Sequence, residues 1–329
     1  MQAAYRKLAD NKIELVRFWG DSPVVEVPGK IAGCTVASVA PYAFSAYREE
    51  LEEDLIFCGE EGEKDGVFAR EETLRCGGNI REIHLPPEVG AIGNYAFYGC
   101  MEMKVFHGTD RILRMGSGVF TGCRLSRVQI DFYDGAKSCL KEILTEIRYG
   151  ITATLVYGGV PAKVVFPEYY ADAVENTPAR IVETHYYGSG GDYRECFYRR
   201  ELDFGKYDGM FALSAARDQG EVTACVALAR LLYPLHLDGK AADRYAAYVR
   251  EHGGEILRYA AARLEEGKDF AIGGVLQVIG FCCREGYFDR QALETGITLA
   301  GETGQTELLS ILMDERHKRF PKKKKEFIL

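Results

Sequence analysis

Two histidines, His84 and His107, have a spacing that could bring two imidazoles together on one surface. They stand 23 residues apart, and each follows an apolar residue, Ile83 or Phe106. An imidazole changes its charge near neutral pH, so an adjacent pair predicts recognition of a partner that weakens as the pH falls. An ordinary solvated sheet face with no partner is the alternative interpretation.

No arrangement of residues in the sequence indicates catalysis. There is no Gly-x-Ser-x-Gly elbow, and the six histidines are dispersed as single residues. The triplet Asp-Phe-Gly at 203–205 matches one kinase motif, but the glycine-rich loop and the catalytic-loop motif are missing. Asp131 and Asp134 could act as the paired carboxylates of a hydrolase, yet two acids beside Gly135 are ordinary in a turn. The sequence therefore predicts a protein that is not an enzyme.

The ten cysteines predict neither a metal site nor a disulfide framework. No Cys-x-x-Cys pair occurs, and the neighbours Cys282 and Cys283 would diverge by about 100° on a helix, which is poor chelating geometry. Scattered cysteines in a long chain without an export signal favour free thiols in a reducing compartment. We therefore expect no metal, no cofactor and a cytoplasmic location.

Neither a membrane span nor a nucleic-acid surface is indicated. Residues 1–15 carry too many charges for a secretion signal, and the longest apolar stretch, 270–283, is too short to cross a bilayer. The net charge is −8, and the last thirteen residues hold six basic side chains against one acidic one, so the rest of the chain is more acidic still. An acidic body argues against binding to nucleic acid.

The basic tail, residues 321–329, ends in the apolar residues Phe327, Ile328 and Leu329. A tail that only keeps the terminus solvated needs no apolar end, so these three residues are a candidate docking peptide. A solvated terminus is the competing interpretation.

A repeat organises the first half of the chain. Units of about 23 residues can each hold one strand and a return loop, and stacking buries the apolar edge that a single unit would expose. The pairs that match at this shift are Val89 and Ile112, Gly93 and Gly116, Phe97 and Phe120, and Cys100 and Cys123. A looser copy occupies 25–44, and the segment 49–78 interrupts the pattern. Phe97 and Phe120 are predicted to stack in a buried aromatic spine, with the two cysteines as small apolar side chains beside it.

The pattern of a strand, a proline and then Ile-Gly-x-x-Ala-Phe-x-x-Cys resembles the BspA-type leucine-rich repeat of bacterial proteins, over residues 24–130. The resemblance implies a short β-solenoid and a habit of binding other molecules rather than a reaction. Many members of that family are exported or attached to the surface and are linked to adhesion, so an adhesion-related role is one alternative.

Strand parity predicts which side chains of the repeat face outward. If Ile83, Phe106 and Val128 face the core, the residues on either side of them face out. Two outward columns result, with neighbouring strands about 4.8 Å apart. The columns, which form our candidate protein-binding surface, are Glu82, Val105 and Arg127, and His84, His107 and Gln129.

After residue 130 the repeat decays into elements that we interpret as a closing cap. We expect a helix over 136–148, strands over 151–157 and 163–167, and a hairpin whose strands, 181–187 and 193–198, flank the Gly-Ser-Gly-Gly sequence at 188–191. This glycine-rich sequence could hold a phosphate only if it opened a helix, and a hairpin turn is the preferred interpretation.

Beyond residue 205 the sequence changes to Ala, Leu and Arg at helical spacing, broken by glycines and by Pro234. The predicted helices are 221–232, 241–252, 255–266, 270–285, 290–301 and 306–319. Short helices joined by glycine turns suggest an array of antiparallel pairs. The stretch 292–312 is similar in rhythm to an ankyrin repeat, although the full ankyrin signature is missing.

The sequence thus predicts an α+β chain, with a leucine-rich-repeat solenoid and its caps at 1–205, a helical repeat-like domain at 206–320 and the basic tail. The predicted function is a bacterial, cytoplasmic scaffold or adaptor that binds proteins and has no catalytic residues. A regulatory subunit that positions or inhibits a partner enzyme is the main alternative. We expect a protein partner, no nucleic acid and no insertion into a membrane.

Overall fold

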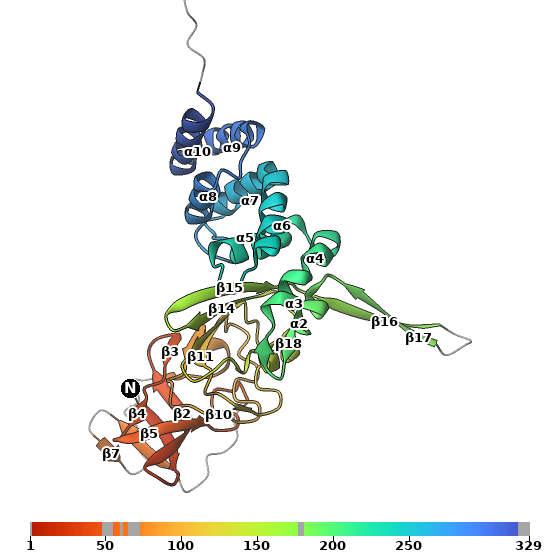
Figure 1. Cartoon of the computed structure of the whole chain (residues 1–329). Helices are drawn as coiled ribbons and strands as arrows, with labels where there is room; N and C mark the ends of the chain where they lie inside the picture. Colours follow the sequence, from red (N-terminus) through yellow and green to blue (C-terminus); the bar gives the residue numbers. More distant parts are fainter. Residues whose placement is uncertain (1, 48–54, 60–61, 65–72, 177–180, 322–329) are drawn as a thin grey trace, which may run out of the picture. The chain divides into compact units, whose positions relative to one another are not determined.

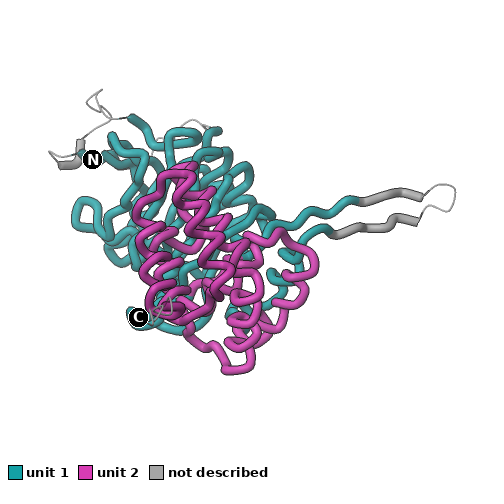
Figure 2. The backbone as a smooth tube through the Cα atoms, turned by 90° about the horizontal axis from the view of Figure 1, so that it is seen from above, with its two compact units in different colours: residues 1–162, 166–203 teal, residues 163–165, 204–329 magenta. Residues whose placement is uncertain are grey.

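The computed structural model of the chain describes residues 2–47, 55–59, 62–64, 73–176 and 181–321. It divides into two compact units, shown in different colours in Figure 2. Unit 1 contains residues 1–162 and 166–203, and unit 2 contains residues 163–165 and 204–329. Strands dominate unit 1 and helices make up most of unit 2, which confirms the predicted α+β class.

One sheet of unit 1 is built mainly from parallel strands that successive coils contribute (Figure 1). Parallel pairing runs without a break from β3 to β14. In order, the strands are β3 (Val24–Glu26), β9 (Glu82–His84), β11 (Val105–Thr109), β13 (Arg127–Phe132), β14 (Ile151–Tyr157) and β15 (Val160–Phe166). We call this the parallel sheet.

A second sheet receives the other short strand of each coil. Its parallel part joins β5 (Cys34–Val39), β10 (Ala91–Ile92) and β12 (Arg114–Met115). The sheet continues from β5 through β2 (Lys12–Gly20), β1 (Gln2–Lys7), β6 (Ile56–Gly59) and β7 (Gly62–Lys64), with β4 (Lys30–Ile31) paired to β5 and β8 (Thr73–Leu74) paired to β2. A short 3-10 helix, η1, spans Gly77–Asn79.

Equivalent residues of successive coils lie side by side, as the shift of 23 positions predicts. Ile83 pairs with Phe106 across β9 and β11, and Phe106 pairs with Val128 across β11 and β13. All three side chains are buried. The inward column of the parallel sheet is therefore part of the core.

The predicted aromatic spine is confirmed. The Phe97 ring stacks on Phe44 and on Phe120, with 5.4 Å between ring centroids in each pair, and all three rings are fully buried. The Cys100 thiol donates to the Phe44 carbonyl at 3.2 Å, and the Cys123 thiol donates to the Phe97 carbonyl at 3.1 Å. The two cysteines thus tie each coil to the preceding one.

Gly118 shows why one turn of the repeat requires glycine. Its φ is +65°, in the left-handed region, and a Cβ at this position would lie 2.3 Å from the Tyr95 ring. Tyr42 and Tyr95, which occupy the equivalent position of earlier coils, also have positive φ and stack on each other at 5.3 Å. A side chain at 118 would displace the Tyr95 ring, whatever its rotamer.

Helix α1 (Leu140–Glu146) closes the ladder of coils with a carboxylate. In the preceding coil the Phe97 amide donates to the Val119 carbonyl of the next coil. For the equivalent residue, Phe120, the acceptor is instead the Glu146 carboxylate at 2.7 Å, which also accepts from the Val119 amide at 3.2 Å. Glu146 therefore replaces the backbone of one further coil. The predicted helix at 136–148 exists but is shorter at both ends.

The predicted hairpin of 181–187 with 193–198 is wrong. Strand β17 (Ile181–Tyr187) pairs instead with the preceding strand, β16 (Tyr170–Asn176), and the glycine-rich sequence opens a short helix, α2 (Gly190–Arg194). The reason for the glycine is close packing, because a Cβ on Gly190 would lie 2.0 Å from the Pro167 carbonyl oxygen. The remaining strands of unit 1 are β18 (Phe197–Tyr198) and β19 (Glu201–Leu202).

Arg194, at the end of α2, is a buried cation with no carboxylate among its hydrogen-bond partners. Its guanidinium donates to the main-chain carbonyls of Leu144, Ile147, Tyr149, Pro167 and Gly190 at 2.7–3.3 Å. It also lies over the Tyr169 ring, 4.9 Å from its centroid. Burial lowers the pKa of Arg194 to about 10. This side chain fastens α1 to the segments that follow β15 and β17.

Unit 2 is an array of helices in which α5 packs on α6, α7 on α9, and α9 on α10 (Figure 1). The helices are α3 (Phe204–Gly209), α4 (Phe211–Arg217), α5 (Gly220–Leu232), α6 (Gly239–Glu251), α7 (Gly253–Glu265), α8 (Val275–Arg284), α9 (Arg290–Glu302) and α10 (Thr306–Arg319). The helix predicted at 270–285 begins later, at Val275, because Phe270 and Gly273 form an isolated bridge that breaks the first turn. The likeness to ankyrin stays a prediction.

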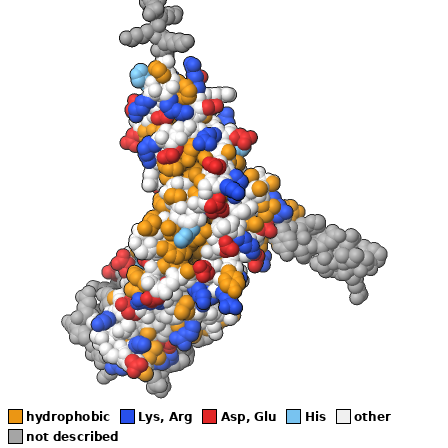
Figure 3. Space-filling view, in the orientation of Figure 1, with side chains coloured by type: hydrophobic (Ala, Val, Ile, Leu, Met, Phe, Trp, Pro, Cys, Tyr) orange, Lys and Arg blue, Asp and Glu red, His pale blue; other side chains and the backbone are white. Residues whose placement is uncertain are grey.

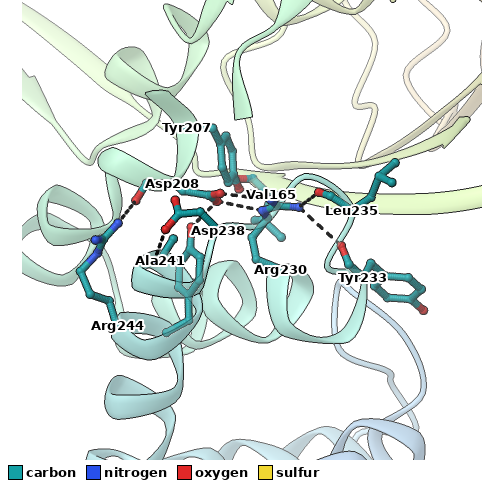
Figure 4. A network of polar contacts seen from close by, with 10 residues as sticks. Val165, Tyr207, Asp208, Arg230, Tyr233, Leu235, Asp238, Ala241 and Arg244 are labelled. Atoms are coloured by element: carbon teal, nitrogen blue, oxygen red, sulfur yellow. Dashed lines mark hydrogen bonds and ion pairs between the residues drawn. The ribbon is translucent and has the colours of Figure 1, made fainter. Parts of the chain in front are cut away.

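One buried ion pair joins the first helices of unit 2 (Figure 4). The Arg230 guanidinium of α5 donates to both Asp208 oxygens of α3, at 2.8 and 3.1 Å. The Tyr245 hydroxyl of α6 donates to the same carboxylate at 2.8 Å. Arg230 is fully buried and Asp208 nearly so. Three helices thus meet at one carboxylate.

Candidate protein-binding face of the parallel sheet

The outward positions of β9, β11 and β13 bring the six predicted surface residues into two columns. Glu82, Val105 and Arg127 are direct partners across the three strands. His84, His107 and Gln129 are the partners two positions further along. Parallel register places equivalent side chains next to one another, so the order within each column is the order of the coils.

The outward positions differ from the inward ones in exposure. Arg127 is exposed, and the other five residues of the two columns are half-buried. The inward residues between them, Ile83, Phe106 and Val128, have at most 1% of their surface exposed. The face is therefore accessible, although its side chains cover one another.

A continuous set of polar contacts crosses both columns. The Arg127 guanidinium lies 3.8 Å from the Glu82 carboxylate, which lies 3.6 Å from His84 Nε2. His84 Nδ1 and His107 Nδ1 are 3.2 Å apart, and the two rings meet at an interplanar angle of 74°. His107 Nε2 is 2.7 Å from Asp131 Oδ2. Each imidazole therefore stands between the other imidazole and a carboxylate.

Asp131 belongs to this network, although the predicted surface did not include it. Its Oδ1 accepts from the Gln129 amide at 3.0 Å while its Oδ2 contacts His107. Strand parity could have found it, because Asp131 follows Gln129 by two residues and so faces the same side. Asp134, the other acid of the hypothetical hydrolase pair, instead pairs with Arg111 at 2.5 Å. The two acids therefore have different partners.

The turn after β13 uses a third acid in the way expected of turn chemistry. The buried Asp110 carboxylate accepts from the backbone amides of Asp134 and Gly135, at 2.7 and 3.0 Å. An aspartate that accepts from consecutive amides stabilises a turn.

A groove with a volume of about 680 Å³ opens on the second sheet, beside β5, β10 and β12. Its walls include Val39, Ile92 and Met115 together with the charged residues Glu14 and Arg114. Glu142, also at the groove, is engaged by Arg200 at 2.7 Å. The groove carries no pair of histidines or converging carboxylates comparable to the face of the parallel sheet.

Several predictions concern features other than this face. The candidate docking tail, Phe327, Ile328 and Leu329, lies outside the described residues. All ten cysteines lie within them and are free. In the described part of the chain no helix is long and apolar enough to cross a membrane. Nor do the described residues contain a group of three or more His, Cys, Asp or Glu side chains placed to hold a metal ion.

Comparison with known proteins identifies the repeat. Residues 71–146 match the family model of the BspA type leucine rich repeat region, in six copies. A search of curated proteins and a search of solved structures gave no significant match. The matched segment holds β9 to β13 and the spine residues Phe97 and Phe120, so the predicted resemblance is confirmed where the stacking is most regular. Residues 71–146 therefore form a leucine-rich repeat region of the BspA type.

Proposed function

We propose that this chain is a scaffold or adaptor without catalytic activity, and that a protein partner binds the outward face of β9, β11 and β13. A leucine-rich repeat region suggests protein–protein interaction. The observation that carries the proposal is the pair of side-chain columns held in parallel register on three adjacent strands.

The chemistry of the two columns favours a protein over other partners. Within a few ångströms they offer a carboxylate, a guanidinium, two imidazoles, an amide and the apolar Val105. Such a mixture suits the varied surface of a protein, whereas a nucleic acid would require a basic surface. On the face of the molecule shown in Figure 3, acidic and basic side chains are interspersed.

The contacts among the columns favour a specific partner. Glu82, His84, His107 and Asp131 hold one another in place, so a partner would lose little side-chain entropy on binding them. Strands also hold such groups more rigidly than loops do.

We assign the protein to the cytoplasm. The supporting observation is that the ten thiols are free, nine of them buried in apolar surroundings. A chain that folds with so many reduced thiols is suited to a reducing compartment.

The test is capture of a partner by a variant that reverses the charge of the face. The tagged full chain serves as bait in extracts of its native cell, captured proteins are identified by mass spectrometry, and the Kd is then measured with the purified partner. His84→Glu combined with Arg127→Glu adds negative charge beside Glu82 and Asp131. We expect the Kd to rise by about 100-fold or more, as for the loss of several kcal/mol of interface energy.

A matched control carries the same change in net charge elsewhere in the repeat. Thr121→Glu with Arg124→Glu alters two exposed residues of the turn after Phe120. We expect this control to keep full affinity, and both double variants to keep the melting temperature of the wild type. Full capture by the His84→Glu, Arg127→Glu variant would contradict the proposed face.

A further inference from the structure

The hydrogen bond from His107 to Asp131 fixes where this imidazole carries its proton. His107 Nε2 is 2.7 Å from a carboxylate oxygen, and a carboxylate only accepts. Nε2 therefore bears the hydrogen in the neutral ring. The lone pair is on Nδ1, the nitrogen that faces His84.

His84 has the same orientation. Its Nε2 lies 3.6 Å from the Glu82 carboxylate, and its Nδ1 faces His107. The two Nδ1 atoms, 3.2 Å apart, are closer than the ring centroids at 5.2 Å, so both nitrogens lie between the rings. Two carboxylates on the outer sides and two lone pairs on the inner side form a symmetric arrangement.

Two facing lone pairs require a shared cation. The separation of the Nδ1 atoms matches two ligands of one metal ion, because bonds of about 2.0–2.1 Å across 3.2 Å subtend an angle of about 100–106°, close to tetrahedral. Imidazoles aimed at such an ion would have centroids about 5 Å apart, near the observed 5.2 Å. Metal-binding histidines commonly donate their other N–H to a carboxylate, as His107 does to Asp131.

We propose that His84 and His107 bind a divalent transition-metal ion, Zn²⁺ or Cu²⁺, through their Nδ1 atoms. Asp131 and Glu82 orient the two rings and raise their basicity. Water completes the coordination in the isolated chain, since the described residues hold no group of three ligands. The prediction of no metal site rested on local cysteine spacing, whereas these two ligands come from neighbouring coils and meet only after folding.

This site does not depend on the proposed protein partner, because both ligands belong to one chain. A partner that binds the same face could supply a further ligand at the water positions. Removing the metal would then weaken capture of the partner, but metal binding by the chain alone would persist if the face bound no protein.

The experiment is titration of the chelator-treated full chain with Zn²⁺ by calorimetry. A Cys58→Ser background removes the one cysteine that is not buried. We expect one ion per chain at micromolar concentrations, and loss of binding in both His84→Ala and His107→Ala. Asp131→Asn should weaken binding by about 10- to 100-fold, the usual effect of losing an outer carboxylate partner. His317→Ala, an exposed histidine of α10, is the matched control and should bind as the parent does.

Cu²⁺ gives a second readout that depends on the ligands themselves. The electron paramagnetic resonance spectrum should show coupling to two imidazole nitrogens in the parent, and to one or none in His84→Ala. Absence of binding below about 1 mM, where affinity is only about 4 kcal/mol, would overturn the proposal. Binding that survives both histidine substitutions, or a pair of rings that shares a proton instead of taking up metal, would overturn it as well.

Discussion

The two units of the chain hold their cores together in different ways. In unit 1, equivalent residues of successive coils stack on one another, as the rings of Phe44, Phe97 and Phe120 do. In unit 2, helices α3, α5 and α6 meet at a single buried ion pair between Asp208 and Arg230. Stability in unit 1 is spread over repeated apolar contacts, whereas part of unit 2 depends on one polar contact that no other residue repeats.

The difference matters because the two kinds of contact fail differently. Removal of one ring from a stack costs burial and leaves a cavity, but the other rings keep their contacts. Removal of one partner from a buried ion pair leaves the other charge desolvated without compensation. We therefore expect the largest effect of a single substitution in unit 2, although its contact is more local.

Arg230→Met should have the largest effect. It leaves the buried Asp208 carboxylate with the Tyr245 hydroxyl as its remaining side-chain donor, and we expect it to lower the free energy of unfolding by about 5 kcal/mol, the upper end of the usual range for breaking a buried pair. Hydrogen exchange followed by mass spectrometry would locate the loss of protection in α3, α5 and α6.

The matched control removes both charges. Arg230→Met combined with Asp208→Leu leaves no unpaired charge, and such replacements are often neutral or stabilising. We expect the double variant to be more stable than Arg230→Met alone. A double variant that is no more stable would show that packing, rather than charge, explains the single substitution.

Phe97→Ala should have the next largest effect. The ring contacts Phe44, Phe106 and Phe120 and is fully buried, so we expect a loss of about 4 kcal/mol from burial and the cavity left behind. Denaturation followed by exchange of unit 1 peptides is the measurement.

Phe120→Ala is the comparison within the same stack. Phe120 contacts Phe97 and Phe106 but has no ring of a further coil beyond it, so its removal should cost less, about 3 kcal/mol. An equal loss of exchange protection in unit 2 after either substitution would contradict the view that the two units are stabilised separately.

The sequence predicted the parts of the structure that repeat. A shift of 23 residues was sufficient to place Phe97 against Phe120 and His84 against His107, because stacking of coils converts sequence spacing into contact. The same shift and strand parity placed the two outward columns. Asp131 was omitted from the surface only because parity was not extended by one more step along β13.

Contacts that occur once could not be predicted in this way. Asp208 and Arg230 are separated by 22 residues, and no pattern in the sequence indicates that they pair. Helix α3 was missed because its sequence, Phe-Gly-Lys-Tyr-Asp-Gly, has two glycines and is too short for a helical period. The hairpin was assigned to the wrong strands because the glycines at 190–191 indicate a turn, whereas Gly190 permits close packing on Pro167.

Arg194 and Arg230 sharpen the comparison, because both are buried arginines but only Arg230 faces a carboxylate. Arg194→Met removes donors from five main-chain carbonyls and leaves no opposite charge behind. We expect a loss of about 2 kcal/mol, the cost of leaving buried acceptors poorly satisfied, in chemical denaturation of unit 1. Arg194→Lys, which keeps the charge but cannot reach five carbonyls, should be no better. A loss as large as that for Arg230→Met would mean that the charge itself, and not its carbonyl partners, determines the cost.

Buried thiols provide the smallest effect, and one in which the two units should behave alike. Burial raises the pKa of Cys139, in unit 1, and of Cys225, in unit 2, from the ordinary value of 9.0 to about 12. Between these values the unfolded chain ionises its thiol while the folded chain keeps it neutral, so each thiol contributes stability that is present below pH 9 and is lost as the pH rises toward 12. At pH 10 the loss is about 1.4 kcal/mol for each thiol, and at pH 8 it is close to zero. Cys139→Ala and Cys225→Ala should each reduce, by about that amount, the fall in the free energy of unfolding between pH 8 and pH 10, whatever each substitution costs at neutral pH. Urea denaturation at the two pH values measures this fall. If Cys225→Ala flattened the pH dependence and Cys139→Ala did not, the solenoid core would admit water where the helical array excludes it, and the apolar stacking of unit 1 would be looser than its ring distances indicate.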